Sequence, residues 1–569
     1  MKEITLDNLC EKAEQLNEKT STIMVEEKPI RDKFSDMAGA IASAVNRNSR
    51  IKILTDYDAD GICSAYIMHT MLQRINPELS VSVVCNDRRE AYGVPKFVEP
   101  DADTQYIILD MGSNELDYIR NTFGRQAIVI DHHLIEDEDV KFQFEIFPNL
   151  LNPHYLHDDD TLNADYCATG LAYRIYTELS EKYPQLRDTV LQNTLSAIAC
   201  IGTCADVVNL ADEHSQNRHI VQKGLQAIGN ATEQNMDSTI LYMLDKCGVI
   251  KPDVTAKDIA FNVAPVLNSA SRMSELLHVN GAMLMYHTLM MTDTDKIDFM
   301  LEVNQVRKEY SKSLQGGQYQ DFVQSERFSD DNIAVYIADN IPSGFCGLVA
   351  GKLAEALDKA VICLTYNKAS RTYTGSGRNA KGQSSLKELI DLAVSSPEAE
   401  GIEIQYGGHT DAVGISSLNN AELFEKALKA CAGELTKEQD MTFLKITPEE
   451  LSSPETIQKL QSLEPVGNGF QIPPVLVEGE IKNQRTLAKR EDWKSFSVDG
   501  MKVTDWSYSA EKYPQNQSGN VRFPAELSIS DFRGTHIELN AIWNRQIYDD
   551  FQQEIQSEQK IKKNSKIER

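Results

Sequence analysis

Residues 51–61 read Ile51-Lys-Ile-Leu-Thr-Asp56-Tyr-Asp58-Ala-Asp60-Gly61, an apolar run followed by three aspartates at alternate positions and a glycine. Alternate residues of an extended chain point to the same side, so we expect the three carboxylates to crowd together at the end of a strand. Like charges this close need a cation to neutralise them, and hard oxygen ligands favour Mg2+ or Mn2+. Taken alone, the stretch fits a solvated acidic turn equally well.

The same pattern, an apolar segment followed by a potential metal ligand, recurs three times along the chain. In an open parallel sheet, ligands bind outside the carboxyl ends of the strands, so these side chains are expected to converge. Taken singly, Asp110 could cap a helix and His132 and His133 could lie on the surface. Together the segments predict a dinuclear metal site. They are Tyr106-Ile-Ile-Leu-Asp110, Ala127-Ile-Val-Ile-Asp131-His132-His133 and Ile201-Gly-Thr-Cys-Ala-Asp206.

The apolar periodicity predicts an α/β protein. Short apolar strands alternate with amphipathic stretches at first, which favours a parallel sheet covered by helices. These strands are Ile51–Thr55, Val81–Cys85, Tyr106–Leu109 and Ala127–Ile130. A Pro-free segment from Asp295 to Gln324 predicts a long connecting helix, interrupted at Gly316-Gly317, before a second α/β unit. The predicted regions are a helical lead-in (1–45), the parallel-sheet domain (46–235), a helical segment with the connecting helix (236–325), the second α/β domain (326–435), a turn-rich β domain (436–550) and a charged, solvated tail (551–569).

The motif set resembles the DHH phosphoesterase superfamily, and within it the RecJ single-strand-specific exonucleases. The resemblance extends in order from about residue 50 to about residue 475. Besides the metal motifs it includes Asn217-Arg218, which follows the Asp206 motif, and five further segments. These are Asn86-Asp-Arg-Arg-Glu-Ala-Tyr92-Gly93, Ala264-Pro-Val-Leu-Asn268-Ser-Ala-Ser-Arg272, Gly375-Ser376-Gly377-Arg378 with Gly407-Gly408-His409, and Leu463-Glu-Pro465-Val-Gly467-Asn468-Gly469. The resemblance implies a DHH domain joined by a long helix to a DHH-associated α/β domain, followed by an OB-like β domain.

The resemblance also implies a role for each site residue. Metal ligands are Asp56, Asp58, Asp60, Asp110, His132 and Asp206. Of these, Asp58, Asp110, His132 and Asp206 would hold one ion, and Asp56 with Asp60 would help to hold the second. His133 would face the scissile phosphate and Asp131 would orient an imidazole or a water, while substrate phosphate would meet Arg272, Ser376, Arg378, Gly407, Gly408 and His409. The alternatives are a structural salt bridge for Arg272 and loop packing for His409.

Four positions depart from the family pattern. Leu54-Thr55 stands where the family has His-Gly, which makes the second metal the less secure of the two. Ser271 replaces a glycine beside Arg272, and Asp411 adds negative charge beside the presumed phosphate loop. Gly467-Asn468-Gly469 shuffles the usual glycine and asparagine order, from which we expect an altered turn.

The composition sets limits on the function. The net charge of −28 is unusual for a nucleic-acid enzyme, because phosphate contacts supply much of the affinity for nucleic acid. Ten cysteines without a CxxC pair predict reduced thiols and a cytoplasmic location, and no apolar run is long enough for a membrane span. The last region contains Trp493, Trp506 and Trp543 with Phe496, Tyr508, Phe523 and Phe532, which are candidates for base stacking or for an ordinary β core.

The function expected from the resemblance is a single-stranded-DNA-specific 5′→3′ exonuclease. It would release 5′-mononucleotides by two-metal-ion catalysis with Mn2+ or Mg2+ in DNA repair or recombination. Its partners would be single-stranded DNA and a single-strand-binding protein or helicase. Two alternatives remain open: a phosphodiesterase acting on short RNA or cyclic dinucleotides, and a non-catalytic DNA-binding scaffold.

Overall fold

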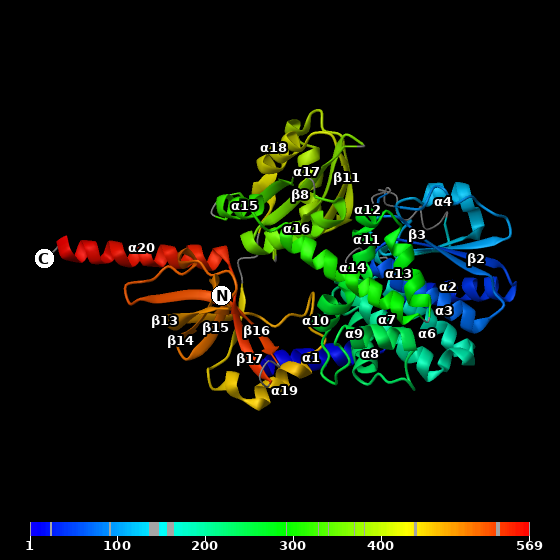
Figure 1. Ribbon diagram of the computed structural model, residues 1–569, viewed down its shortest axis with the longest axis horizontal. Helices are drawn as coiled ribbons and strands as arrows, with labels where there is room; N and C mark the ends of the chain where they lie inside the picture. The colour runs from blue at the N-terminus through cyan, green and yellow to red at the C-terminus, as the bar shows by residue number, and fades with distance from the viewer. Residues whose placement is uncertain are drawn as a thin grey trace.

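The computed structural model describes residues 2–567 apart from 23–25, 90–92, 136–146, 156–163, 292, 328, 330, 339–340, 369, 381, 437–440 and 531–534, and without the side chains of His409 and residues 561–567. Three bodies are visible in Figure 1: a sheet covered by helices at one end, a second α/β unit, and a β-barrel at the other end. No helix in this described part of the chain is both long and apolar enough to cross a bilayer.

The first sheet is entirely parallel and has the strand order β3-β2-β4-β5-β6. The four predicted strands are confirmed, and only the two-residue strand β6 was missed. The chain leaves β2 toward β3 on one side and returns to β4 on the other, so the order reverses between β2 and β4, where α/β proteins bind ligands. The strands are β2 (Arg50–Thr55), β3 (Val81–Cys85), β4 (Thr104–Leu109), β5 (Ala127–Ile130) and β6 (Leu150–Leu151).

Helices cover both faces of this sheet. The larger core contains α2, α3, α6 and α7, and the smaller core on the other face contains α4. Residues predicted as a lead-in contribute to the larger core, because Phe34 and Ile41 of α2 are fully buried there. The helices are α1 (Leu6–Thr20), α2 (Lys28–Asn46), α3 (Ala59–Ile75), α4 (Leu116–Phe123), α6 (Ala168–Lys182) and α7 (Thr189–Ala205).

A run of helices leads to the second α/β unit. The predicted connecting helix is present as α14 (Thr294–Ser313), and the break around Gly316-Gly317 separates it from α15 (Gln318–Glu326). Ahead of α14 lie α8 (Asn217–Gly229), α9 (Ser238–Lys246), α10 (Ala256–Asp258), a π-helical turn (Ile259–Val263), α11 (Ala264–Arg272), α12 (Ser274–Leu277) and α13 (Gly281–Met290).

The second unit is a five-stranded sheet in the order β10-β11-β9-β8-β7. Strands β7 and β8 are parallel and the other pairs are antiparallel. The register places Ser376, Gly414 and Gly407 in one row across three strands. The elements are β7 (Ile333–Ala338), α16 (Ser343–Leu357), β8 (Ala360–Asn367), β9 (Thr372–Arg378), α17 (Leu386–Val394), β10 (Ile404–His409), β11 (Ala412–Leu418) and α18 (Ala421–Cys431).

The predicted C-terminal β domain is a closed barrel of five strands in the order β13-β14-β15-β17-β16, the strand number of an OB fold. Phe496 and Phe523 are core residues, Trp506 stays about half exposed against Trp493, and Phe532 lies outside the described residues. The strands are β13 (Val475–Leu487), β14 (Arg490–Val498), β15 (Met501–Asp505), β16 (Asn520–Ser530) and β17 (His536–Ala541).

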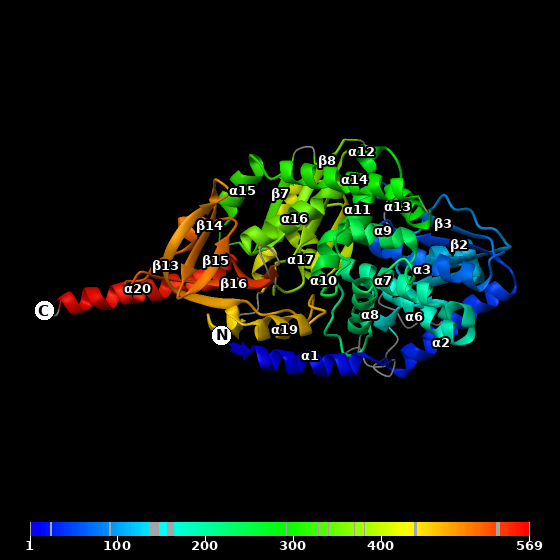
Figure 2. The ribbon, with the colours of Figure 1, turned by 60° about the horizontal axis from the view of Figure 1, so that its bottom comes forward.

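Helices at the two ends of the chain attach this barrel. The charged tail is not an irregular end, because α20 (Arg545–Ile567) runs through it, anchored on the barrel by the buried side chains of Phe551 and Ile555. At the other terminus, β1 (Lys2–Thr5) pairs with β12 (Thr442–Lys445), and α1 runs from the barrel to the first domain beside α19 (Pro454–Ser462) (Figure 2). The N-terminal segment therefore connects the barrel to the first domain, whereas α20 packs on the barrel.

Candidate metal centre and substrate site

The three aspartates of the opening motif lie at the turn from β2 into α3. The predicted extended geometry is wrong, because β2 ends at Thr55 and α3 begins at Ala59. Asp58 is the N-cap of α3, and its Oδ1 accepts hydrogen bonds from the backbone amides of Asp60 (2.9 Å) and Gly61 (3.1 Å). A side chain at Gly61 would place Cβ 2.5 Å from the carbonyl oxygen of Asp56, so the tight turn requires glycine.

Asp110 connects the ligand groups. It follows β4 in the left-handed conformation (φ 60°) and is buried. Its ligand oxygen lies within 4.8 Å of those of Asp56 and Asp58, and in a second grouping it meets His132 and His133 at the same spacing. The Nε2 atom of His132 is 3.2 Å from Asp110 Oδ1. Asp110 is therefore placed where a ligand shared by two ions would stand.

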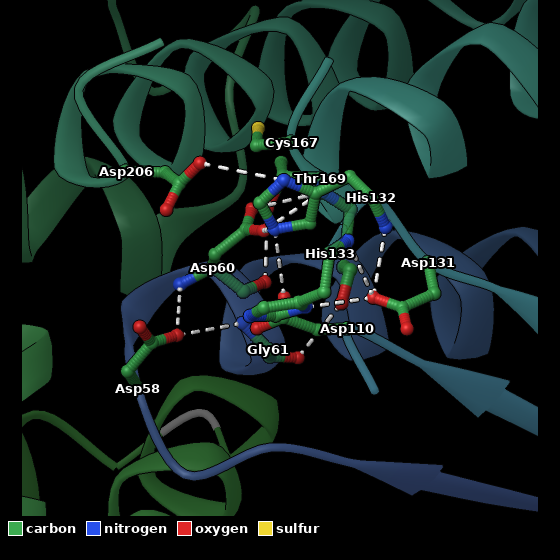
Figure 3. A network of polar contacts seen from close by, with 12 residues as sticks. Asp58, Asp60, Gly61, Asp110, Asp131, His132, His133, Cys167, Thr169 and Asp206 are labelled. Atoms are coloured by element: carbon green, nitrogen blue, oxygen red, sulfur yellow. Dashed lines mark hydrogen bonds and ion pairs between the residues drawn. The ribbon is translucent and has the colours of Figure 1, made fainter. Parts of the chain in front are cut away.

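Asp60 joins a third group of ligand atoms, with His132 and Asp206. Its carboxylate accepts hydrogen bonds from the amides of Ala168 (2.8 Å) and Thr169 (2.9 Å), so it also caps α6. His132 Nδ1 lies 3.9 Å from Asp206, which is at the end of α7 (Figure 3). The predicted set of metal residues is thus brought together. The grouping differs from the predicted one, because Asp58 lies with Asp56, and Asp60 lies with His132 and Asp206.

The electrostatics of the centre call for cations. Burial first, and the charge of Asp58 second, raise the pKa of Asp56 to about 8 and that of Asp60 to about 6. Burial and the neighbouring carboxylates likewise raise the pKa values of Asp110 and Asp206 well above the usual range. Asp56 Oδ1 is buried and has no hydrogen-bond partner among the described residues. Divalent cations would satisfy this oxygen and offset the charge, so the donor set fits a metal centre.

Asp131 and His133 form a separate, polarised pair beside the ligands. Asp131 Oδ1 lies 2.8 Å from His133 Nδ1, and the amide of Ser113 donates to Oδ2 at 2.8 Å. Burial alone would raise the pKa of Asp131 and lower that of His133. The attraction between the two groups outweighs burial, so the pKa of Asp131 is lowered and that of His133 is raised. The structure therefore orients His133 with a carboxylate at Nδ1.

Four arginines converge next to the carboxylates. Burial, together with the charges of Arg88, Arg378 and Arg307, lowers the pKa of Arg272 to about 9. Arg272 contacts the carbonyl of Gly344 at 3.2 Å, which is no salt bridge. Clustered guanidinium groups that lower one another's pKa are what an anion site requires. Sequence reasoning did not assign Arg88 and Arg307, although Arg88 stands within a quoted motif.

The residues predicted in the second unit lie on strands β9 and β10, which are separated by β11. Arg378 donates to Ser376 Oγ (2.6 Å), and Gly347 of α16 packs against both side chains, since a Cβ there would lie 2.8 Å from Arg378 Nη2. Gly407 has open space on its Cα, which would let a ligand approach the backbone. Gly408 sits opposite Val413 with φ 141°. His409 closes the row opposite Ala412, and its side chain lies outside the described residues.

Two of the departures from the family pattern have local consequences that the sequence did not predict. Leu54 is fully buried in the smaller core, with Leu116 and Phe123 of α4. Asp411 is held at the β10–β11 turn, where its carboxylate accepts a hydrogen bond from the Asn379 side chain at 3.1 Å. The side chain of Leu54 therefore packs in the hydrophobic core. The carboxylate of Asp411 is hydrogen-bonded to the side-chain amide of Asn379 within its own domain.

A large cleft of about 1430 Å³ adjoins the site and was not anticipated from the sequence. It is lined by Asn268, Arg272 and Arg307 near the site and by residues 526–530 of the barrel strand β16 at its other side. Phe261, in the π-helical turn, lines the cleft with 67% of its side chain exposed. An exposed aromatic residue in a cleft offers a flat surface for stacking, and π-helical turns are frequent at functional sites.

Comparisons with known proteins show which sequences and folds this chain resembles. The sequence model of the DHH family, N-terminal domain, matches residues 50–203. The single-stranded-DNA-specific exonuclease RecJ of Bacillus subtilis (strain 168) is 24% identical over 464 residues, covering 79% of this chain and 54% of that protein. RecJ of Dickeya dadantii (strain 3937) is 24% identical over 536 residues, covering 87% of each chain. The chain thus spans about half the length of the B. subtilis relative.

The fold also resembles a solved structure. The crystal structure of RecJ in complex with Mn2+ from Thermus thermophilus superposes with a TM-score of 0.65 at 20% identity, over 90% of this chain and 71% of that one. The likeness establishes that the three bodies described above form a RecJ-like architecture.

Proposed function

The chain carries the N-terminal domain of the DHH family within a RecJ-like fold, and on that premise we propose that it is a metal-dependent exonuclease for single-stranded DNA. It would hydrolyse phosphodiester bonds from the 5′ end and release 5′-mononucleotides. The observation that carries the proposal is that two clusters of opposite charge lie close enough to shift one another's pKa values. Carboxylates suited to cations lie beside four arginines suited to phosphate, and the charge of Arg88 acts on both Asp56 and Arg272.

The metal-holding residues are proposed to be Asp56, Asp58 and Asp110 for one ion and Asp60, His132 and Asp206 for the other, with Asp110 between them. Two Mn2+ or Mg2+ ions bound there would activate a water at neutral pH and offset charge on the reacting phosphate. The departure at Leu54 removes no ligand from these groups, because Leu54 lies in the core.

The chain's own groups perform the remaining tasks. Arg88, Arg272 and Arg378 bind the nonbridging oxygens of the phosphate and orient it toward the carboxylates. Asp131 raises the pKa of His133 and so favours the protonated ring, which would donate to a phosphate oxygen as charge accumulates there. Asp131 fixes the ring through Nδ1.

A polymeric substrate is favoured by the cleft. Its volume of about 1430 Å³ exceeds the roughly 300–1,000 Å³ typical of sites for small ligands, and it extends from the arginines to the barrel. A strand entering along the barrel would reach the metal centre past Phe261. This arrangement is the reason to prefer single-stranded DNA over a cyclic dinucleotide as the substrate. The relatives named RecJ carry the same substrate in their names.

The proposal is tested with Asp110→Asn, which preserves size but removes the charge shared by the ligand groups. Release of mononucleotides from a single-stranded oligonucleotide should fall at least a thousandfold with Mn2+ present. Asp117→Asn is the matched control, because Asp117 pairs with Arg120 on the surface of α4 and should leave activity unchanged. Activity retained by Asp110→Asn would refute the assignment, and a wild-type protein that cleaves only dinucleotides would favour the phosphodiesterase alternative.

A further inference from the structure

Residues Leu463–Phe470, here called the latch, join α19 to the first barrel strand and dock onto the loop that follows Asp206. Asn468 makes two hydrogen bonds to this loop. Its side-chain Nδ2 donates to the carbonyl of Val207 at 2.9 Å, and its own carbonyl accepts from the amide of Leu210 at 2.8 Å. Asn468 therefore contacts this loop at Val207 and at Leu210, near its beginning and three residues further on.

Val207 is held in an unfavourable conformation at this point. Its φ is 61°, in the left-handed region that a β-branched residue rarely enters, and its side chain is 61% exposed, so side-chain packing does not impose the conformation. The hydrogen bond from Asn468 fixes the Val207 carbonyl, which is the first carbonyl after the metal-site residue Asp206. Strain at one residue beside a ligand indicates that the surrounding contacts are required to hold it.

The latch itself is firmly anchored in the first domain. The guanidinium of Arg218, on α8, donates to the carbonyls of Pro465 (2.8 Å) and Leu463 (2.9 Å) and lies over the ring of Phe470 at 4.5 Å. Gly469 has φ 75°, and a Cβ there would lie 1.7 Å from Asn209 Oδ1, so the fit admits only glycine. Asn468 and Gly469, whose order departs from the family pattern, therefore both contact the loop that follows Asp206.

We propose that the latch is a positioning element for the metal centre: Asn468 holds Val207 in its left-handed conformation and thereby orients the Asp206 carboxylate toward His132. The inference rests on the proposed function, because it takes Asp206 as a metal ligand. It goes further by tying that ligand to the segment that begins the barrel. Displacement of the latch lowers metal affinity, so the barrel and the metal centre are mechanically coupled.

The experiment measures Mn2+ binding to the full-length protein from the electron paramagnetic resonance signal of free Mn2+, which requires no substrate. Asn468→Ala should raise the half-saturating Mn2+ concentration about three- to tenfold. Val207→Gly added to that variant should return it to within about twofold of wild type, since glycine adopts the left-handed conformation without strain. Asn419→Ala is the matched control, because its amide also donates to a main-chain carbonyl, that of Gly401, in another domain.

Unchanged Mn2+ binding by Asn468→Ala, or a loss that Val207→Gly does not reverse, would overturn the proposal. If Asn468→Ala does not fold, the near-isosteric Asn468→Asp removes the same donor and carries the same expectation. If the variants change Mn2+ binding as expected but the wild-type protein binds Mn2+ and cleaves no nucleic acid, the proposed function is refuted. The positioning role of the latch would still hold.

Discussion

Replacing Arg272 by methionine should make the metal-free protein more stable while it weakens substrate binding. Arg272 is held among Arg88, Arg307 and Arg378, and burial together with these charges lowers its pKa from the ordinary arginine value to about 9. A lowered pKa means that the folded state disfavours the charged form at neutral pH, so removing the charge relieves a cost. Methionine keeps most of the length of the side chain and removes only the guanidinium.

The magnitude follows from the pKa. The lowering of the Arg272 pKa from the ordinary arginine value to about 9 corresponds to at most about 5 kcal/mol at about 1.4 kcal/mol per pKa unit. Partial exposure of the side chain to water reduces this to about 1–2 kcal/mol. Differential scanning calorimetry of the metal-free protein should therefore show a higher thermal midpoint for Arg272→Met. Inorganic phosphate should raise the midpoint of the wild type and have little effect on the variant.

Arg174 supplies the matched comparison, because it is also buried but fully paired. Its Nε and Nη2 atoms lie 2.6 and 2.8 Å from the two carboxylate oxygens of Glu26. Arg174→Met leaves that carboxylate buried without its partner and should cost about 3–5 kcal/mol. If Arg272→Met is destabilised to a similar extent, Arg272 has a structural role and the reasoning about the arginine cluster is wrong.

Three further predictions concern the metal centre, Arg88 and the cleft. The folded-state pKa values of Asp60 (about 6) and Asp56 (about 8) are raised, so the metal-free protein loses stability as the pH rises through these values and the carboxylates ionise. Because Mn2+ binds the ionised carboxylates, the increase in thermal midpoint on adding Mn2+ should grow between pH 6 and pH 8.5. An increase that stays constant over this pH range would contradict the prediction. Ser271→Gly removes the hydroxyl that accepts a hydrogen bond from Arg88 Nε at 3.1 Å. KM for a 5′-phosphorylated strand should therefore rise about three- to tenfold, while kcat stays within about twofold of wild type. An unchanged KM would show that the position of Arg88 does not depend on this contact. Phe261→Ala should weaken single-strand affinity about five- to a hundredfold in a fluorescence anisotropy titration without metal, and equal affinity would exclude stacking there.

The fold class could be predicted because short apolar runs recur before Asp56, Asp110 and Asp131, whereas Asp206 follows a helix. Strands β4 and β5 are buried throughout, which leaves a continuous apolar signal, whereas β2 and β3 also contain partly buried and exposed residues. Strand β6 has only two residues, Leu150 and Leu151, which is too short for any periodicity. The helical end of the chain was missed because a charged composition resembles a solvated tail, whereas Phe551 and Ile555 anchor α20 on the barrel.

That the candidate ligands lie close together could be predicted from residue type and position, but their grouping could not. Alternation along an extended strand would have kept Asp56, Asp58 and Asp60 on one side. The N-cap at Asp58 starts a helix instead, which turns Asp60 toward α6. The arginine cluster and the latch depend on contacts between residues far apart in sequence, such as Arg88 with Ser271 and Asn468 with Val207, for which the local pattern contains no signal.

The central claim is tested most directly by the products formed from end-labelled substrates. Purified protein with Mn2+ is given a single-stranded oligonucleotide labelled in turn at its 5′ and 3′ ends, alongside a duplex and an RNA of the same sequence. The account predicts immediate release of labelled mononucleotide from the 5′ end of the single-stranded DNA only. Release first from the 3′ end, or no cleavage of any polymer by a protein that binds Mn2+, would contradict it.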